Sequence, residues 1–319
     1  MRKIIIADNV PKLIEELHSK LPDWETIVCE DRNRHLPQMK EAEIFIGWGD
    51  KIPFVLEYAE NLKWIQCMSA GVDSVPFARL RERGIFLTTA SGVHANSISE
   101  TVLGIMMAFS RQLFNIHIDQ MNKRWNHDYS DIGGLTEIHD KTIGIVGAGA
   151  IGVELARLAK AFNMRTLGCR RSGKDAPHID KMVDTAGLHT LLAESDYVVN
   201  ILPGTDETVG LFGDAEFAAM KNTAVYIAVG RGNTTNTDAV VRAMETGAIA
   251  GAGLDVVDPE PLPADSPLWG MRNVYIGSHN AGGTDRYMER GLAIFSENLS
   301  AYTAGKTPGL NLVDYDLQY

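Results

Sequence analysis

A glycine-rich turn within residues 141–172 constrains the fold of this chain more than any other feature. Residues 147–152 read Gly-Ala-Gly-Ala-Ile-Gly, between an apolar run at 142–146 and a helical pattern at 150–162, and a second apolar run follows at 165–168. In a strand–turn–helix unit, the first glycine of G-x-G-x-x-G permits the tight turn, the second lets backbone N–H groups approach a pyrophosphate, and the third lets helix and strand pack closely. The pattern predicts a dinucleotide-binding unit; the alternative is a glycine-rich turn without a ligand.

The residues expected at the pyrophosphate lie in the turn and at the start of the helix. A helix N-terminus holds an anion through its free N–H groups and its dipole. These residues are Gly147, Gly149, Ala150, Ile151 and Gly152.

The end of the second apolar run indicates which dinucleotide binds. An NAD-binding unit places Asp or Glu about 20 residues beyond the first glycine, where it accepts hydrogen bonds from the ribose. Here the chain reads Arg170-Arg171-Ser172, with no carboxylate before Asp175. Guanidinium groups bind phosphate through charge-assisted, often bidentate hydrogen bonds. We therefore expect NADP(H) as the preferred cofactor, with NAD(H) as the alternative if the arginines are only a solvated strand end.

Composition limits the class of protein. A chain of 319 residues is long enough for two domains. The formal net charge of −11 argues against a nucleic-acid surface. The three cysteines are widely spaced, which indicates neither a disulfide framework nor a metal site.

No apolar run approaches the roughly 18 residues that a membrane helix needs. Because the chain enters a strand at about residue 4, leaving no room for a signal peptide, we expect a cytoplasmic protein.

Apolar runs alternate with helical patterns on both sides of a long helical stretch at 97–122. This rhythm predicts parallel sheets, and the glycine turn predicts a doubly wound nucleotide domain in the second half. Strands are expected at 4–7, 26–29, 44–46, 64–68 and 86–88, and then at 142–146, 165–168, 197–201, 224–229, 251–256 and 274–277.

Two strand ends in the first half are candidates for substrate binding, because ligands sit at the carboxyl ends of parallel strands. Ala70-Gly71-Val72 follows one strand, and its consecutive N–H groups suit a carboxylate. Trp48 follows another strand as a possible wall of the substrate site. The alternatives are a plain βα turn and a tryptophan packed at the rim.

Three ionisable residues follow three successive strands of the second half: Arg231, Glu260 and His279. Such strand ends converge on one crevice. Together these side chains suit reduction of a 2-keto acid. The arginine binds the carboxylate and polarises the carbonyl, while the histidine gives a proton to the oxygen as hydride arrives at carbon. Glu260 is expected to orient His279 through a hydrogen bond and to favour its charged form.

The motifs GAGAIG, AVGRGN, GAGLDVVDPEPLP and SHNAGGT, with SAGVDSV and GVHANSISETVLG, resemble the D-isomer-specific 2-hydroxyacid dehydrogenase family over essentially the whole chain. The resemblance implies an α/β fold with two Rossmann-like or flavodoxin-like domains, parallel sheets and an active site in the interdomain cleft. It places the substrate domain at residues 1–98 plus 282–319 and the dinucleotide-binding domain at 99–281.

The same resemblance implies roles for individual residues. Arg231, Glu260 and His279 become the catalytic trio, and Ala70, Gly71 and Val72 hold the substrate carboxylate. Further cofactor contacts are expected from Leu202, Pro203 and Thr208 on the adenine side, and from Ala228, Val229, Asp255 and Gly282 on the nicotinamide side. Family members are usually homodimers that close their domains over the substrate.

The sequence thus predicts NAD(P)H-dependent reduction of small 2-keto acids to D-2-hydroxy acids, and the reverse reaction. Arg170-Arg171-Ser172 is similar to the NADPH-preferring glyoxylate and hydroxypyruvate reductase-like branch. The alternative is a dinucleotide-sensing interaction protein of the same fold without significant turnover. The compact chain, with no disordered tail to recruit partners, favours the enzyme.

Overall fold

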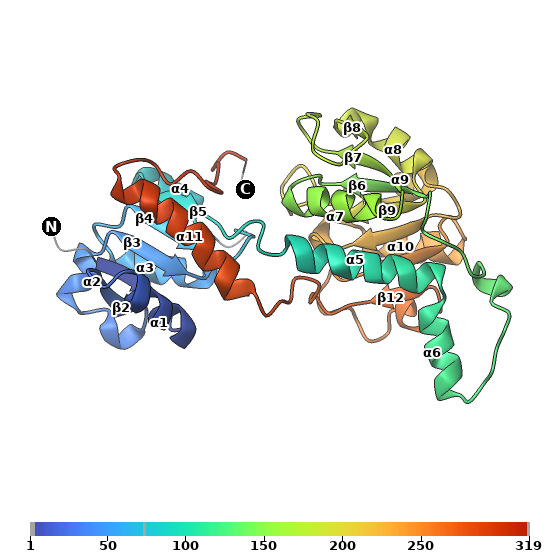
Figure 1. Ribbon diagram of the computed structural model, residues 1–319, viewed down its shortest axis with the longest axis horizontal. Coiled ribbons are helices and arrows are strands. Elements are labelled where there is room, and N and C mark those ends of the chain that lie inside the picture. Colours follow the sequence, from blue (N-terminus) through green and yellow to red (C-terminus); the bar gives the residue numbers. More distant parts are fainter. Residues whose placement is uncertain (1–3, 73–74, 318–319) are drawn as a thin grey trace. The chain divides into compact units, whose positions relative to one another are not determined.

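The computed structural model describes residues 4–72 and 75–317, and the chain forms two compact units (Figure 1). The first unit consists of Met1–Val93 and Thr284–Tyr319, and the second of His94–Gly283. The domain boundaries predicted from the sequence, after residue 98 and before residue 282, stay a proposal. Asp73 and Ser74 of the SAGVDSV motif lie outside the described residues.

The described part of the first unit contains a five-stranded parallel sheet in the order β2-β1-β3-β4-β5, which is the flavodoxin-like arrangement. Its strands are β1 (Ile4–Ala7), β2 (Glu25–Val28), β3 (Ile44–Gly47), β4 (Trp64–Cys67) and β5 (Phe86–Thr88). Its helices are α1 (Pro11–Lys20), α2 (Pro37–Glu41), α3 (Ile52–Tyr58), α4 (Phe77–Glu82) and α11 (Tyr287–Thr303), with 3-10 turns η1 (Asp31–Asn33) and η2 (Gly49–Lys51).

Successive side chains point to opposite faces of this sheet. Both faces carry apolar side chains, and helices cover both. Ile4 and Ile6 contribute to a core with α2, α3 and α4. Ile5 and Ala7 point to the other face, where they form a core with α1 and α11. Proline in the first turn of α1, α2 and α3 suits a helix start, because its missing N–H has no intrahelical partner there.

The second unit contains a seven-stranded parallel sheet in the order β12-β11-β10-β9-β6-β7-β8, a doubly wound arrangement. Its strands are β6 (Thr142–Val146), β7 (Arg165–Cys169), β8 (Lys181–Val183), β9 (Tyr197–Asn200), β10 (Val225–Ala228), β11 (Gly251–Leu254) and β12 (Val274–Ile276). Its helices are α5 (Ala95–Ser110), α6 (Leu113–Met121), α7 (Ala150–Lys160), α8 (Leu188–Glu194), α9 (Asp214–Ala219) and α10 (Thr237–Glu245), with 3-10 turns η3 (Ser130–Ile132), η4 (Thr185–Gly187), η5 (Gly232–Thr234) and η6 (Pro267–Gly270).

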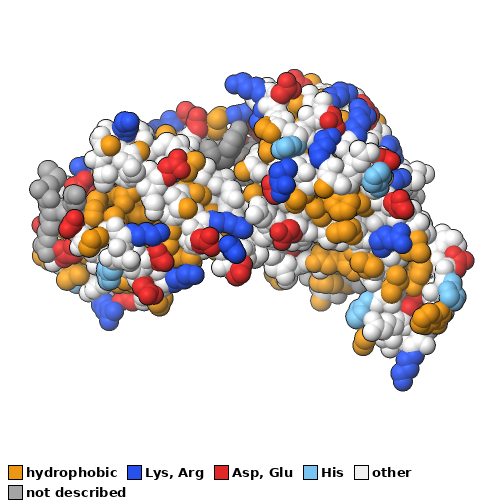
Figure 2. Space-filling view, viewed as in Figure 1, with side chains coloured by type: hydrophobic (Ala, Val, Ile, Leu, Met, Phe, Trp, Pro, Cys, Tyr) orange, Lys and Arg blue, Asp and Glu red, His pale blue; other side chains and the backbone are white. Residues whose placement is uncertain are grey.

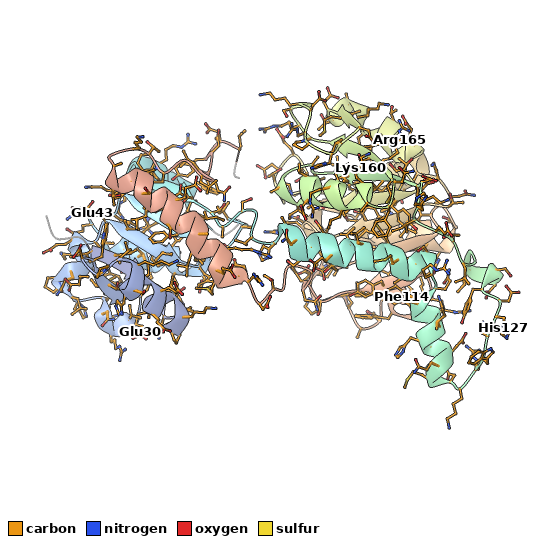
Figure 3. All side chains as sticks on the ribbon, viewed as in Figure 1. Glu30, Glu43, Phe114, His127, Lys160 and Arg165 are labelled. Atoms are coloured by element: carbon orange, nitrogen blue, oxygen red, sulfur yellow. The ribbon has the colours of Figure 1, made fainter. Side chains whose placement is uncertain are left out.

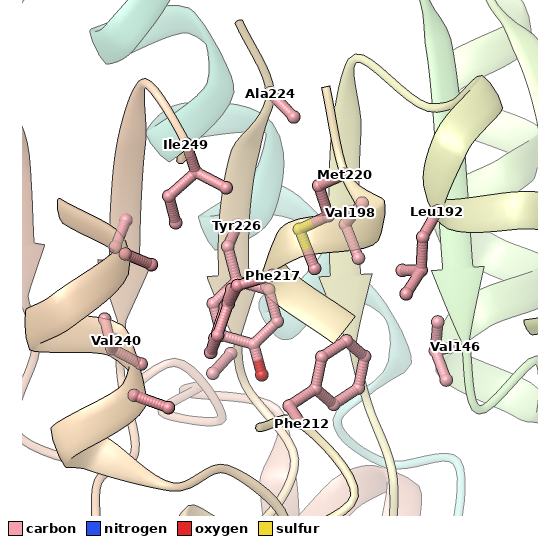
Figure 4. Close-up of a cluster of buried hydrophobic side chains, with 14 of the residues drawn as sticks. Val146, Leu192, Val198, Phe212, Phe217, Met220, Ala224, Tyr226, Val240 and Ile249 are labelled. Atoms are coloured by element: carbon pink, nitrogen blue, oxygen red, sulfur yellow. The ribbon is translucent and has the colours of Figure 1, made fainter. Parts of the chain in front are cut away.

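Two buried clusters cover the faces of this sheet. One joins α5 and α7 to Ile143 and Ile145 of β6. The other joins α8, α9 and α10 to the opposite face, where Phe212 and Phe217 pack around Tyr226 (Figure 4). With both faces buried, the central strands read as continuous apolar runs, which is why they are visible in the sequence. The predicted fold class of two parallel-sheet α/β domains is confirmed.

The long helix expected at 97–122 is in fact two helices. α5 ends at Ser110 and α6 begins at Leu113. Between them Gln112 has a φ of 54°, and its amide donates hydrogen bonds to the carbonyls of Ile132 and Gly134 at 3.0 and 3.1 Å. The apolar spacing continues across this break, which therefore leaves no trace in the periodicity. No helix of the described residues combines the length and apolar character that a membrane span needs.

Candidate active site

The glycine turn after β6 has the geometry that a pyrophosphate needs. Gly147 has a φ of 97°, which favours glycine, and a Cβ there would lie 2.8 Å from the backbone of Ile201. At Gly152 a Cβ would lie 2.9 Å from Ile145 of β6, so the third glycine lets α7 pack on the strand. A Cβ on Gly149 would meet no atom within 4 Å, so the space beside it is open. The turn therefore fits a dinucleotide.

The start of α7 supplies hydrogen-bond donors next to this open space. The first backbone hydrogen bond of the helix runs from Val153 N–H to the Gly149 carbonyl at 2.9 Å. The N–H groups of Ala150, Ile151 and Gly152 precede that bond and lie at the positive end of the helix dipole. β6 pairs with both β7 and β9, so the turn lies where the strand order reverses, which is the usual ligand crevice of such sheets.

The guanidinium of Arg170, at the end of β7, donates hydrogen bonds within its own loop. Its Nε donates to the Lys174 carbonyl and its Nη2 to the Asp175 carbonyl, both at 2.6 Å. Ser172 Oγ accepts from the Lys174 N–H at 3.4 Å. These hydrogen bonds fold residues 170–175 into a compact, largely exposed turn. Arg170 therefore shapes the loop expected at the 2′-phosphate.

Arg171 is more exposed than Arg170, and one of its guanidinium nitrogens lies 3.9 Å from Glu207 Oε2. The Arg171 side chain is 44% exposed and that of Glu207 is 72% exposed, and ion pairs at such exposed positions are weak. Arg171 therefore places a guanidinium at the surface of the loop that is expected to meet the 2′-phosphate.

The residues predicted on the adenine side form a second turn, after β9. The Thr208 hydroxyl donates to the Pro203 carbonyl at 2.6 Å, and its oxygen accepts from the Thr205 N–H at 2.9 Å. Thr208 thus holds the turn closed. Leu202 N–H, at the start of the turn, donates to Asn200 Oδ1 at 3.1 Å.

The residues predicted on the nicotinamide side lie at the ends of β10 and β11 and before the chain leaves the second unit. Ala228, Val229 and Asp255 are buried. Gly282 is packed against His94, whose Nδ1 lies 2.8 Å from the Gly282 carbonyl oxygen.

Glu260 and His279 are brought together, as expected. Glu260 Oε2 lies 3.0 Å from His279 Nδ1, and Glu260 Oε1 accepts from the Val257 N–H at 3.3 Å. Because Nδ1 faces the carboxylate, Nε2 is the nitrogen left for proton transfer. Both side chains are partly exposed. The geometry is that of an acid–base histidine oriented by a carboxylate.

Asp255 holds the turn that carries His279. Its Oδ1 accepts from the Asn280 N–H at 3.1 Å and its Oδ2 from the Ala281 N–H at 3.0 Å, while its carbonyl accepts from the His279 N–H at 2.8 Å. His279 has a φ of 55°, an uncommon conformation for a residue with a side chain. The hydrogen bonds from this turn to Asp255 stabilise that conformation.

Arg231 lies on the loop after β10, and this loop touches the loop of Glu260. A Cβ on Gly232 would lie 1.9 Å from the Val257 carbonyl oxygen, so only glycine lets the two backbones approach so closely. The Arg231 carbonyl accepts from the Thr234 hydroxyl at 2.7 Å. Since β10, β11 and β12 are neighbours in the sheet, the three predicted catalytic residues follow three adjacent strands.

In the first unit, the predicted carboxylate-binding turn Ala70–Gly71–Val72 follows β4. Ser69 Oγ donates to the Gly71 carbonyl at 2.8 Å, and the Ser69 carbonyl accepts from the Ala90 N–H at 3.1 Å. Ala70 is exposed and Val72 is buried, so the turn is anchored at one end and open at the other.

Trp48 lies just after β3 and is half-buried. It packs against the core that α1 and α11 form with the sheet, and its N–H donates to Asp8 Oδ2 at 3.3 Å. Its contacts therefore include rim packing, and its role toward substrate stays a prediction.

Several residues that shape the site were not found from the sequence. Asn200 and Thr234 were missed, and Asp255 was given only a cofactor role. One signal was available: Asn200 interrupts the apolar run Tyr-Val-Val-Asn-Ile, and a buried polar side chain needs partners.

A cavity of about 440 Å³ in the second unit lies elsewhere. Lys141, Asp196 and Thr223 line it, and these residues precede or begin β6, β9 and β10. It is therefore at the amino-terminal edge of the sheet, opposite the glycine turn. We place the chemistry at the carboxyl edge, because the open space at Gly149 and the Glu260–His279 pair are both there.

A doubly wound domain with this glycine turn and an oriented histidine defines a dinucleotide-dependent oxidoreductase. Residues 103–281 match the family model described as D-isomer specific 2-hydroxyacid dehydrogenase, NAD binding domain. The chain belongs to the D-isomer-specific 2-hydroxyacid dehydrogenase family, which confirms the family predicted from the motifs.

Relatives of known name agree with this assignment. Glyoxylate/hydroxypyruvate reductase B of Yersinia pestis is 32% identical over 289 residues, which are 88% of each chain. A D-isomer specific 2-hydroxyacid dehydrogenase family protein from Aeromonas salmonicida has a solved structure with a TM-score of 0.83, 32% identity and 99% coverage of both chains. The NADPH-dependent glyoxylate/hydroxypyruvate reductase of Sinorhizobium meliloti, solved with NADP and sulfate, has a TM-score of 0.81, 25% identity and 100% coverage of both.

Proposed function

We propose that this chain is an NADPH-dependent reductase of small 2-keto acids, glyoxylate and hydroxypyruvate among them, that forms D-2-hydroxy acids and also catalyses the reverse reaction. The observation that carries the proposal is the 3.0 Å hydrogen bond between His279 Nδ1 and Glu260, in the same unit as a glycine turn that fits a pyrophosphate. The relatives named reductases favour this function over a dinucleotide-sensing protein without turnover.

NADPH, held by Gly147 and Gly149 of the glycine turn and by the N–H groups at the start of α7, would supply the hydride for the carbonyl carbon of the keto acid. Arg231 binds the substrate carboxylate and polarises the carbonyl. His279 donates the proton on Nε2 to the carbonyl oxygen, so a C–H bond and an O–H bond form as the C=O double bond becomes single. Glu260 keeps Nδ1 hydrogen-bonded, which orients the ring so that Nε2 faces the position of the carbonyl oxygen.

The remaining site residues divide between substrate and cofactor. The N–H groups of Ala70, Gly71 and Val72 hold the substrate carboxylate, and Trp48 forms part of the wall near them. Asp255 and Gly282, with Ala228 and Val229, surround the nicotinamide, while Leu202, Pro203 and Thr208 flank the adenine.

The preference for NADPH rests on the loop after β7. Arg170 holds residues 170–175 in their turn, and Arg171 with Ser172 binds the 2′-phosphate. No carboxylate precedes Asp175 in this loop, so nothing there favours a ribose hydroxyl over a phosphate. NAD(H) is the weaker cofactor.

We also propose that the protein is a homodimer and works in the cytoplasm. Hydrophobic side chains are grouped over the region of α5 and α6 in the second unit (Figure 2). A patch of this kind supports a protein–protein interface. The three cysteines are free and buried, in agreement with a reducing compartment.

Initial rates with NADPH and NADH test the function. The substrates are glyoxylate, hydroxypyruvate, pyruvate, 2-ketobutyrate and phenylpyruvate. We expect turnover in the ordinary enzyme range, about 1–10³ per second, with NADPH and a small keto acid. Absence of turnover with either cofactor, despite cofactor binding, would support the sensing protein instead.

Variants of the β7 loop test the cofactor assignment. Arg171→Ala should raise the KM for NADPH about tenfold or more, since a charge-assisted phosphate contact is lost, and leave the KM for NADH unchanged. Arg170→Ala/Arg171→Ala should abolish the preference. Arg165→Ala is the matched control. Arg165, which Figure 3 labels, begins the same strand at its other end. It forms an ion pair with Glu194. Equal effects of Arg165→Ala and Arg171→Ala would contradict the assignment.

A further inference from the structure

A cluster of buried polar side chains lies beneath the loops of the proposed site. Asn200, at the end of β9, is fully buried, and its Nδ2 lies within hydrogen-bond distance of three hydroxyls: Tyr226 at 2.9 Å, Thr234 at 2.9 Å and Thr235 at 3.2 Å. The Tyr226 and Thr235 hydroxyls are 2.6 Å apart. Figure 4 shows Tyr226 among apolar side chains with its hydroxyl oxygen at one end. Buried hydrogen-bond networks of this kind fix a single local structure.

One branch of the cluster reaches the backbone of Arg231. The Thr234 hydroxyl accepts from Asn200 and donates to the Arg231 carbonyl at 2.7 Å. The Thr234 N–H also donates to that carbonyl, at 3.2 Å. Thr234 is fully buried, so neither hydrogen bond is exchanged for one with water.

A second branch reaches the turn that is proposed to flank the adenine. Asn200 Oδ1 accepts from the Leu202 N–H at 3.1 Å. A Cβ on Gly230 would lie 2.4 Å from the Leu202 carbonyl oxygen, so the backbone before Arg231 is packed directly on this turn. The Asn200 side chain therefore connects two loops. Its oxygen binds the turn at Leu202, and its nitrogen binds Thr234, which in turn binds the Arg231 carbonyl.

We propose that Asn200 and Thr234 are positioning residues that hold Arg231 in register with the Leu202 turn. The inference rests on the proposed role of Arg231 in binding the substrate carboxylate. A substrate carboxylate and a bound dinucleotide must be held at a fixed separation for hydride transfer, and small displacements of reacting groups cost large factors in rate. The Asn200–Thr234 pair sets that separation from inside the domain, without touching substrate or cofactor.

Two adjacent threonines offer a matched pair of variants. Thr234→Val and Thr235→Val each remove one buried hydroxyl from the same cluster, but only the Thr234 hydroxyl is bonded to Arg231. We expect Thr234→Val to raise the KM for glyoxylate about tenfold, with the KM for NADPH changed less than about twofold. Thr235→Val should leave both KM values within about twofold. Its melting temperature should nevertheless fall about as much as that of Thr234→Val, because each variant loses one buried hydroxyl. Thr234→Ser restores the hydroxyl and should restore the KM for glyoxylate.

A titration of oxalate into the NADPH complex, followed by fluorescence, gives a second readout that needs no turnover. Thr234→Val should weaken oxalate binding relative to Thr235→Val. Equal KM and oxalate affinities in the two valine variants, or no rescue by Thr234→Ser, would overturn the inference. If the wild type binds oxalate but reduces no keto acid, the proposed function fails while the oxalate comparison still decides the inference. If the wild type does not bind oxalate, the role of Arg231 and this inference fail together.

Discussion

Glu260 and His279 are expected to act as one unit, since the carboxylate contributes only through the ring that it orients. His279→Gln should lower kcat by a factor of about 10²–10⁴, the usual contribution of a general acid. Glu260→Gln keeps a hydrogen-bond acceptor near Nδ1 but loses the charge, so its kcat should fall by a smaller factor, about 10 to 100. The double variant should be no slower than His279→Gln alone. When two groups act as one unit, the loss of the first already removes the contribution of the second. Steady-state kinetics with NADPH and glyoxylate measure all three.

The control for this comparison is the dissociation constant of NADPH, which should be unchanged in each variant because neither side chain is assigned to the cofactor. Losses in kcat that multiply in the double variant would show that the two residues work independently.

At the residue scale, the sequence reveals side chains that stand just past strand ends, because their spacing from an apolar run is readable. Glu260 and His279 were found in this way. It does not reveal hydrogen bonds that join segments far apart, such as those of Asn200 to Thr234 and of Asp255 to the turn after His279. Those depend on which strands are neighbours and on how loops approach at glycines.

At the element scale, the predicted strands match because buried parallel strands are continuous apolar runs. The short edge strand β8 was missed, since its first residue is an exposed lysine and its other two are only half-buried. The helix α11 was also missed, although Leu292, Phe295 and Leu299 recur at helical spacing and complete the core of the first unit. No motif draws attention to this segment, so its apolar spacing was not interpreted as a helix that packs on the sheet.

The segment after α6 depends on one buried carboxylate, which makes its stability sensitive to pH. Burial raises the pKa of Asp119, but hydrogen bonds from Tyr129, Asn126 and Arg124 outweigh that effect and hold the pKa below its ordinary value. A carboxylate with a depressed pKa stabilises the fold above its unfolded pKa, and this stabilisation is lost as pH falls through the folded pKa. Asp119→Asn should therefore melt below the wild type at pH 7, and the difference should shrink below about pH 4.

Asp131→Asn is the control, because Asp131 lies in the same segment but is exposed and pairs with Arg272 at the surface. Melting curves at several pH values compare the three proteins. If the melting temperatures of the wild type and Asp119→Asn differ by the same amount at pH 7 and at pH 3, the ionised carboxylate does not have the proposed role.

At the scale of the whole molecule, a net charge of −11 repels the anionic substrates and cofactor that we propose. Binding must therefore rely on local positive groups, and those identified are Arg231, Arg171 and the N-terminus of α7. Salt screens the repulsion of distant surface charges more than it weakens contacts at short range. Selectivity for anionic ligands therefore comes from these local positive groups and not from the net charge of the surface.

The proposed dimer is also a property of the whole molecule, and α6 carries most of its expected interface. Leu113, Ile116, Ile118 and Met121 on this helix are 49%, 41%, 42% and 70% exposed, and Trp125 just beyond it is 90% exposed. So much exposed apolar surface on one helix is costly in water, and burial contributes about 25 cal/mol per Å². We expect light scattering coupled to gel filtration to give twice the chain mass of 35.0 kDa.

Leu113→Glu/Ile116→Glu places two charges on one side of α6, since residues three apart are neighbours on a helix. This variant should elute as a single chain, while Val209→Glu, at a position 58% exposed elsewhere in the second unit, should remain dimeric. Melting temperatures close to the wild type in dilute solution would show that the charges act on association and not on the fold. A wild type that elutes as a single chain, or a double variant that stays dimeric, would mean that the apolar side of α6 serves another purpose.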